Sequence, residues 1–142
     1  PYFDNVTLDM RIISHRSHDV MAVCDAVITV SGTVTLELAL MKKPMVVINK
    51  ISKFSYFFVS KMLKIDHVAL CNIVAGKRVV PELIQSDATT DKISNALLDL
   101  VDNNDKREKI ITEFSSIEER LTNKETKTDL SDLLIDMLNE KI

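Results

Sequence analysis

Runs of apolar and β-branched residues alternate with segments of helical pattern along the first third of the chain. The runs Asp25–Val30 and Met45–Ile48 are nearly all apolar or β-branched, as is typical of strands that helices cover on both faces of a parallel sheet. A third strand candidate, Met10–Ser14, precedes them. The segments between these runs, Ser17–Cys24 and Thr33–Met41, have helical patterns. This β-α-β-α-β order predicts an α/β fold with a Rossmann-like parallel sheet flanked by helices.

Helical patterns dominate the remainder of the chain, apart from a short strand candidate at His67–Leu70 and an irregular stretch at Cys71–Pro81. Thr89 or Thr90, placed before Asp91, provides an N-cap signal for a helix that continues to about Val101. One face of that helix is apolar and consists of Ile93, Leu97, Leu98 and Val101. The other expected helices are Ser52–Lys64, Asp105–Leu121 and Thr128–Ile142.

The last of these helices carries an apolar stripe that must be buried against something. We expect a Rossmann-like domain over residues 1–104 and C-terminal helices over 105–142. These helices pack on that domain, on a missing N-terminal half or on a second copy of the chain, which would make a homodimer. Because the chain begins at Pro1 and its first apolar pattern starts only near Met10, we interpret it as a piece of a longer protein. The stripe consists of Leu130, Leu133, Leu134, Met137 and Leu138.

The composition favours one compact globular domain, because 46% of the 142 residues are hydrophobic and 27% are charged. A net charge of -3 provides no basic face, which argues against a nucleic-acid partner. Cys24 and Cys71 lie far apart without a disulfide or zinc motif, so a reducing cytoplasm is the expected location. His15 and His18 lack the further ligands of a metal site, and neither a metal nor a cofactor is expected.

The segment from Ile51 to Lys64 combines four of the seven aromatic residues of the chain with three lysines and no acid. Together with Lys50 it carries four positive charges, whereas the residues from Asp99 to Ile142 include seven basic and twelve acidic ones. This composition is typical of a helix at a membrane surface. The alternative is that its aromatic residues pack on the sheet. Since no run of 18 apolar residues occurs, we expect at most a peripheral contact with a membrane.

Residues 31–37, Ser-Gly-Thr-Val-Thr-Leu-Glu, follow a predicted strand and open a predicted helix. The first N–H groups of a helix are unpaired and partly positive, which favours an anion such as a diphosphate. Gly32 lets a ligand approach the backbone, and the Ser31 and Thr33 hydroxyls add donors. Glu37, one turn further, can accept hydrogen bonds from both hydroxyls of a ribose. Simple helix capping with a solvated Glu37 explains these residues equally well.

A second polar block, residues 72–85, follows the strand candidate His67–Leu70, and ligands of open α/β sheets bind at such strand ends. The amide of Asn72, the small residues Ala75 and Gly76, and the polar side chains of Glu82 and Gln85 could form the other wall of the same cleft. A plain connecting loop is the alternative. No Gly-x-Gly-x-x-Gly and no P-loop motif occurs, which excludes dinucleotide dehydrogenases and P-loop NTPases. The candidate residues of the block are Asn72, Ala75, Gly76, Glu82 and Gln85.

About half of the chain, from Ser17 to Thr89, resembles the lipid-A-disaccharide synthases. The block Asn-x-x-Ala-Gly…Val-Pro-Glu-Leu-x-Gln is the specific part of this similarity. Cys71 departs from the family pattern, which usually has proline there, and Asn49 stands where tyrosine is frequent; both bear on the shape of the loops. The matching segments are Met21–Ala26, Ser31–Glu37, Lys43–Val47, the aromatic and basic segment, and Asn72–Gln85.

This resemblance implies the donor-binding half of a two-domain glycosyltransferase of the GT-B architecture. The family transfers 2,3-diacylglucosamine from its UDP derivative to 2,3-diacylglucosamine 1-phosphate and releases UDP. By resemblance, Ser31, Gly32 and Thr33 contact the diphosphate and Glu37 holds the ribose. The block at 72–85 completes the wall around the UDP-sugar. The general base is expected in the N-terminal half, so no catalytic residue is assigned and the chain alone is expected to be inactive.

Two other classes of function are compatible with an α/β domain. A peptidoglycan glycosyltransferase or a UDP-N-acetylglucosamine 2-epimerase would share the fold, but the block at 72–85 argues against both. A non-enzymatic interaction domain, such as a flavodoxin-like receiver, would need an acidic cluster at the first strand ends. Asp25 stands there without such a cluster.

Overall fold

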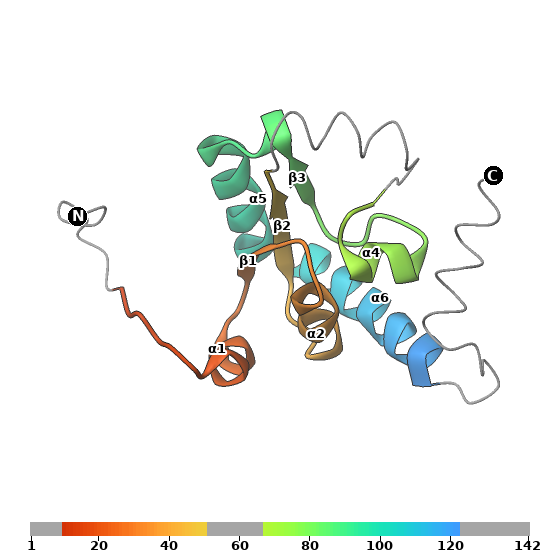
Figure 1. Cartoon of the computed structure of the whole chain (residues 1–142). Coiled ribbons are helices and arrows are strands. Elements are labelled where there is room, and N and C mark those ends of the chain that lie inside the picture. Colours follow the sequence, from red (N-terminus) through yellow and green to blue (C-terminus); the bar gives the residue numbers. More distant parts are fainter. Residues whose placement is uncertain (1–9, 51–66, 123–142) are drawn as a thin grey trace.

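The computed structural model describes residues 10–50 and 67–122. Three parallel strands form one sheet in these residues, in the order β1 (Val27–Val30), β2 (Met45–Asn49) and β3 (Glu82–Ile84), as Figure 1 shows. Each strand is separated from the next by helical segments, which is the connection that parallel strands require. The predicted α/β class with a Rossmann-like parallel sheet is therefore confirmed.

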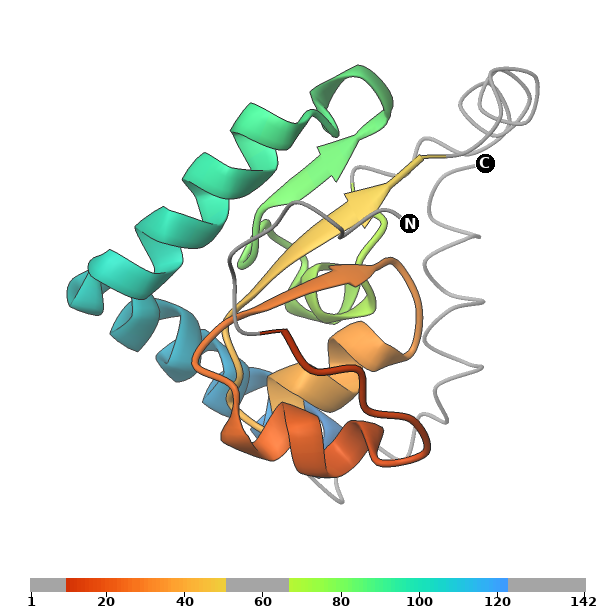
Figure 2. The same cartoon turned by 90° about the vertical axis from the view of Figure 1, so that its left-hand side faces the viewer.

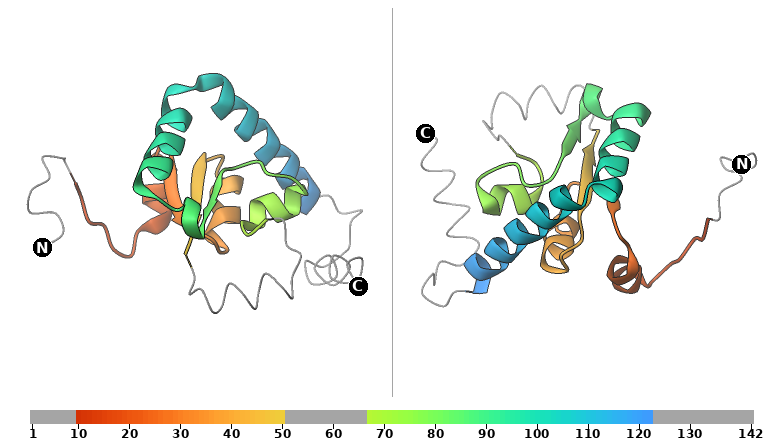
Figure 3. Two further views of the ribbon diagram at one scale, coloured as in Figure 1. Left: turned by 90° about the horizontal axis from the view of Figure 1, so that it is seen from above. Right: turned by 180° about the vertical axis from the view of Figure 1, so that it is seen from behind.

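Helices cover both faces of the sheet. Helix α5 packs on one face, helices α2 and α4 lie on the other, and α6 runs along one end of the molecule against α2, α4 and α5 (Figure 2; Figure 3). The result is a three-layer arrangement that α6 closes on one side. The helices are α1 (Ser17–Val23), α2 (Val34–Leu40), α4 (Leu70–Ala75), the short 3-10 helix η1 (Gln85–Asp87), α5 (Thr90–Asp102) and α6 (Asn104–Thr122).

The central strand β2 is the most deeply buried element. Met45, Val46 and Val47 have no exposed surface, so side chains on both faces of this strand are covered, as its apolar run predicts. Strand β1 pairs only with β2 in the described residues, and burial alternates along it. Ile28 and Val30 remain exposed because α5 contacts β2 rather than β1. The apolar run of β1 therefore does not mean burial on both faces here.

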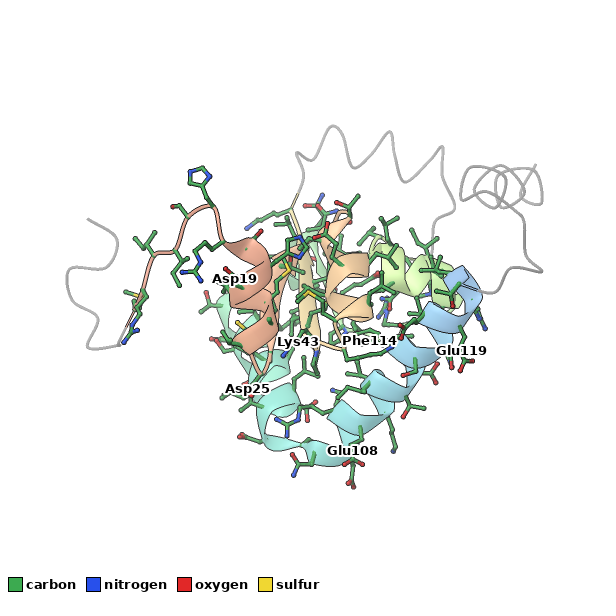
Figure 4. The ribbon with its side chains drawn as sticks, turned by 90° about the horizontal axis from the view of Figure 1, so that it is seen from below. Asp19, Asp25, Lys43, Glu108, Phe114 and Glu119 are labelled. Carbon is green, nitrogen blue, oxygen red and sulfur yellow. The ribbon has the colours of Figure 1, made fainter. Side chains whose placement is uncertain are left out.

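Helix α6 completes the hydrophobic core through one face. Ile110, Phe114 and Ile117 recur at helical spacing and are buried on the side of α6 that contacts α2, α4 and α5. Figure 4 shows Phe114 on the inner side of α6, while Glu108 and Glu119 point outward. The helix expected at Asp105–Leu121 is confirmed and shares one core with the strands.

Helix α5 begins where its sequence signal predicts. The Thr89 hydroxyl accepts a hydrogen bond from the backbone N–H of Lys92 at 3.4 Å, which makes Thr89 the N-cap. Its buried face is rotated from the expected one: Leu100 is fully buried, whereas Leu98 and Val101 are exposed. The inward face consists of Ile93, Ala96, Leu97 and Leu100, which keeps the helical spacing but replaces two of the expected residues.

The prediction of a strand at Met10–Ser14 is wrong. These residues form no strand, and Ile12 and Ile13 are exposed. An apolar run becomes a strand only where a neighbouring strand is in place to exchange hydrogen bonds with it. The helix expected at Ser17–Cys24 is confirmed as α1, which ends one residue earlier.

The order of elements between residues 67 and 84 is also corrected. His67–Leu70 is a turn into helix α4 rather than a strand, and α4 occupies the first half of the stretch expected to be irregular at Cys71–Pro81. The third strand is β3, directly after Pro81, where helical signals had been expected to resume. Three residues are too few to show a period of two, so the sequence pattern did not reveal β3.

The expected helices at Ser52–Lys64 and Thr128–Ile142, with the leucine stripe of the latter, lie outside the described residues. Within residues 10–50 and 67–122, no helix combines the length and the apolar character that crossing a bilayer would require.

Cys71 belongs to the core and is fully buried in α4. Burial raises the pKa of its thiol to about 11, and the negative charge of Glu82 contributes to the increase. Because the folded state favours the protonated thiol, this group adds stability that is present below pH 9.0 and lost as the pH rises toward 11.

We expect the substitution Phe114→Ala to lower the free energy of unfolding by about 3–5 kcal/mol, because it leaves a large cavity between α6 and the helices on which it packs. Urea denaturation followed by circular dichroism measures the loss. The control is Glu119→Ala on the outer face of α6, which should change the free energy by about 0.5 kcal/mol or less. Equal effects of the two substitutions would contradict the observed packing of α6.

Cys71 should resist alkylation in the native chain at pH 8, since its thiol is buried and protonated, and should react once urea unfolds the protein. Cys24, which is partly exposed, should react in the native state. Mass spectrometry of the variants Cys24→Ala and Cys71→Ala separates the two thiols. Rapid native labelling of the Cys24→Ala chain would show that α4 is not packed as described.

Candidate functional site

The carboxyl edge of the sheet brings together the residues that follow β1 and β3. Val30 pairs with Ile48, and Asn49 pairs with Ile84, so Ser31 and Gln85 leave the sheet at the same edge. Strands in a sheet lie about 4.8 Å apart, which puts the backbones of these two residues roughly 10 Å from each other. The two candidate segments of the sequence therefore meet at the edge where open α/β sheets bind ligands.

The loop Ser31–Thr33 connects β1 to α2 and has an open surface. A Cβ atom added at Gly32 would meet no atom within 4 Å, so a ligand can approach its backbone. In the described part of the chain, the backbone N–H groups of Gly32, Thr33 and Val34 have no hydrogen-bond acceptor. Thr33 is exposed and its hydroxyl makes no capping bond. These groups can all donate to an anion.

The Ser31 hydroxyl has a different role from the expected one. It donates to the carbonyl oxygen of Val68 at 2.5 Å, so its hydrogen is already used within the protein. Ser31 thereby ties the loop after β1 to the turn before α4. Its oxygen can still accept a hydrogen bond, but the expected donation to a diphosphate would require this bond to break.

Glu37 lies on α2, one turn after Thr33, and its side chain is partly exposed. Its Oε2 atom is 3.6 Å from Nε2 of His18 on α1. The carboxylate is therefore accessible, and the neighbouring helix limits its direction. The expected role of Glu37 in accepting hydrogen bonds from a ribose stays a prediction.

Thr35 is a residue of the site that sequence analysis missed. It is fully buried; its hydroxyl donates to the carbonyl oxygen of Gly32 at 2.8 Å and accepts from the N–H of Leu70 at 3.1 Å. The hydroxyl therefore fixes the loop after β1 on one side and the start of α4 on the other. A polar residue at a buried helical position, three residues before Leu38, was the available signal.

Asn72 points into the interior of the protein. Its side chain is fully buried, its Nδ2 donates to the carbonyl of Val80 and to Oε1 of Glu82, and its Oδ1 accepts from the N–H groups of Val79 and Val80. Every hydrogen-bonding capacity of the amide is therefore used. The expected contact of Asn72 with a ligand is therefore corrected to a structural role, in which its side chain holds the connection between α4 and β3.

Glu82 is likewise turned inward rather than toward a cleft. Its side chain is fully buried, and Oε1 accepts from the N–H groups of Val68 and Ala69 at 3.0 and 2.8 Å and from Asn72 at 2.9 Å. The carboxylate thus caps the N-terminus of α4 from the neighbouring strand. A substrate-contacting role for Glu82 is not compatible with this placement.

Ala75 and Gly76 lie at the other end of α4, away from the Ser31 loop. Gly76 has φ of +67° and forms the left-handed C-cap of the helix, which explains glycine at this position without a ligand. The Ala75 carbonyl accepts from Nη1 of Arg120 on α6 at 3.3 Å. The expectation that this small pair lines the ligand wall is therefore not supported by their position.

Gln85 has two unusual features at the end of β3. Its φ is +53°, a left-handed conformation that costs free energy in a residue other than glycine. Its Nε2 atom is buried and has no hydrogen-bond partner. Strain and an unsatisfied donor often mark a functional position, which fits the expected membership of Gln85 in the site.

The structure therefore divides the candidate residues into two groups. Ser31, Gly32, Thr33, Glu37 and Gln85 lie on or near the accessible edge, while Asn72 and Glu82 support them from within. No group of three or more potential metal ligands occurs among the described residues. A surface hollow of about 360 Å³ shares no residue with this edge and is lined mainly by polar and acidic side chains of α6, which do not suit an anion. Its lining consists of Asp105, Glu108, Lys109, Thr112 and Glu113.

Known proteins give an independent assignment. The model of the family described as lipid-A-disaccharide synthetase matches residues 2–134. The lipid-A-disaccharide synthase of Nitrosococcus oceani is 46% identical over 85% of this chain and 31% of its own length. The synthase of Geobacter sulfurreducens is 42% identical over 95% of this chain and 35% of its own length. The synthase of Neisseria meningitidis serogroup C is 42% identical over 78% of this chain and 29% of its own length.

These alignments span about a third of the curated relatives and most of the present chain. The similarity includes residues 31–37 and 72–85, of which Ser31 and Gln85 leave the sheet at the same edge. On the match of the family model across almost the whole sequence, this chain belongs to the lipid-A-disaccharide synthetase family.

Proposed function

We propose that this chain is the donor-binding half of a glycosyltransferase of lipid A biosynthesis. The whole enzyme would transfer 2,3-diacylglucosamine from its UDP derivative to 2,3-diacylglucosamine 1-phosphate and release UDP. The observation that carries the proposal is the family match over residues 2–134, which includes the open loop at Ser31–Thr33. Because the chain corresponds to about a third of its relatives, this activity belongs to the whole protein.

The loop after β1 supplies the chemistry that a diphosphate needs. The free N–H groups of Gly32, Thr33 and Val34 and the Thr33 hydroxyl can donate to phosphate oxygens. Glu37 is placed to accept from the hydroxyls of a ribose. Stabilising the departing diphosphate in this way lowers the barrier to transfer without a metal ion.

The proposal gives this chain binding roles and no catalytic base. An inverting transfer needs a group that takes the proton of the acceptor hydroxyl as the new bond forms. We place that group in the part of the enzyme outside this chain. The acceptor sugar phosphate would reach the donor from that side of the cleft.

The binding role of Glu37 can be measured by titrating the chain with UDP in a calorimeter. Glu37→Ala should raise Kd tenfold or more, because a hydrogen bond to a charged group contributes about 1.5–3 kcal/mol. Glu108→Ala on α6 is the control, since it removes a carboxylate of the outer surface and should leave Kd unchanged. A folded chain that binds no UDP, or binds it equally well after Glu37→Ala, would contradict this donor site.

We also propose that the basic and aromatic segment at 51–64 brings the enzyme to the cytoplasmic face of the inner membrane. Its composition and the acylated nature of the proposed substrates support this role. A homodimer is a further proposal, for which the leucine stripe of residues 130–138 is the only support.

Replacing Lys53, Lys61 and Lys64 with Glu should weaken binding to vesicles of anionic phospholipid roughly a hundredfold or more, since each lysine near such a surface contributes about 1 kcal/mol. Sedimentation with vesicles measures the bound fraction. The control replaces three lysines elsewhere with Glu, giving the same net charge. Unchanged binding of the first variant, or equal loss in both, would reject a specific membrane segment. The control lysines are Lys92, Lys106 and Lys109.

A further inference from the structure

The buried carboxylate of Glu82 uses only one of its two oxygens. Oε1 accepts three hydrogen bonds, from the N–H groups of Val68 and Ala69 and from the Asn72 amide. Oε2 is also buried, yet it has no hydrogen-bond partner. A glutamine could make the same three bonds without placing a charge in the interior, which is costly. The second oxygen and its charge therefore need an explanation of their own.

His67 lies directly beside this unused oxygen. Its Nδ1 atom is 3.8 Å from Oε2 of Glu82, and Nδ1 is itself buried without a hydrogen-bond partner. This separation is longer than a hydrogen bond but within the range of an ion pair, so a small rotation of either side chain joins them. Each atom is thus the polar neighbour that the other lacks. Once Nδ1–H donates to the carboxylate, Nε2 is the nitrogen left for another partner.

The position of His67 links this pair to the loop after β1. The carbonyl of the next residue, Val68, accepts from the Ser31 hydroxyl at 2.5 Å. Two residues later, the N–H of Leu70 donates to Thr35, whose hydroxyl in turn holds the carbonyl of Gly32. The turn that carries His67 is therefore fastened to the Ser31–Thr35 segment at two points.

The candidate side chains of the proposed site supply no positive charge. Thr33 and Gln85 are neutral, and Glu37 is negative. These side chains and the free N–H groups of the loop would hold a diphosphate through neutral donors, although charge-assisted hydrogen bonds are stronger. An imidazole ring held by a buried carboxylate can supply such a donor from the adjoining turn, because it donates through Nε2 when protonated.

We propose that His67 is a further binding residue of this site, donating a hydrogen bond to a phosphate group of the bound nucleoside diphosphate, and that Glu82 is the positioning residue that orients its ring. The inference rests on the proposed function for the identity of the ligand. The pairing of His67 with Glu82 does not depend on any ligand and can be tested alone.

Nitrogen-15 NMR of the neutral His67 ring tests the pairing in the ligand-free chain. With Glu82 present, the proton should reside on Nδ1. In Glu82→Gln the three donors keep the amide oxygen in the place of Oε1, so the amide nitrogen occupies the place of Oε2 and donates to Nδ1. The proton should then move to Nε2. The same tautomer in both chains would overturn the positioning role of Glu82, and thermal unfolding confirms that the variant is folded.

Calorimetric titration with UDP tests the binding role. His67→Ala should raise Kd about tenfold. Glu82→Gln should raise it by a smaller factor, because its ring keeps a neutral Nε2–H donor. The double variant should bind like His67→Ala, because both substitutions act through one ring. His15→Ala, an exposed histidine outside this network, is the control and should bind as the original chain does.

The outcomes separate this inference from the proposed function. Binding that is lost in Glu37→Ala but unchanged in His67→Ala would overturn the role of His67 and leave the donor site in place. If the unsubstituted chain is folded but does not bind UDP, both the donor site and the binding role of His67 are overturned. The tautomer measurement decides the role of Glu82 in either case.

Discussion

The connection from α4 to β3 depends on two buried polar side chains. Asn72 holds the backbone of Val79 and Val80, and Glu82 holds the N–H groups at the start of α4. These groups would otherwise be buried without partners, at a cost of about 1–3 kcal/mol each. Since the two side chains also bind each other at 2.9 Å, they lock the beginning and the end of this connection in one network. This network fixes the segment that leads into the third strand.

The same network determines which groups remain available for chemistry. Side-chain oxygens accept hydrogen bonds from the N–H groups of Val68, Ala69 and Leu70 at the start of α4. These N–H groups are therefore not available to an anion. The loop after β1 keeps its N–H groups free, and hydrogen bonds from Ser31 and Thr35 hold it in place. A rigid loop with unused donors is preorganised for a negatively charged ligand. This loop is therefore the segment that we propose to hold the donor diphosphate.

Helix α6 contacts helices from both faces of the sheet, namely α2, α4 and α5. Its buried face supplies the largest fully buried side chain of the described residues, that of Phe114, and its exposed face forms ion pairs with the turn after α2 and with the loop after α4. These pairs, Lys42–Glu118 and Lys77–Glu113, are exposed and contribute little by themselves. The hydrophobic contacts therefore hold α6 in place.

The sequence by itself determined the α/β class, the first two strands of the sheet, the N-cap at Thr89 and the two blocks that carry the family similarity. These features are local, because apolar periods and capping residues act over a few positions. Tertiary structure alone decided the place of β3, which is too short to have a pattern, and the failure of Met10–Ser14 to form a strand. It also decided that Asn72 and Glu82 face inward while Thr33 and Glu37 stay accessible. The same polar atoms of a side chain can form hydrogen bonds with a ligand or with the protein backbone. Only the neighbours of the residue in space determine which of the two partners it has.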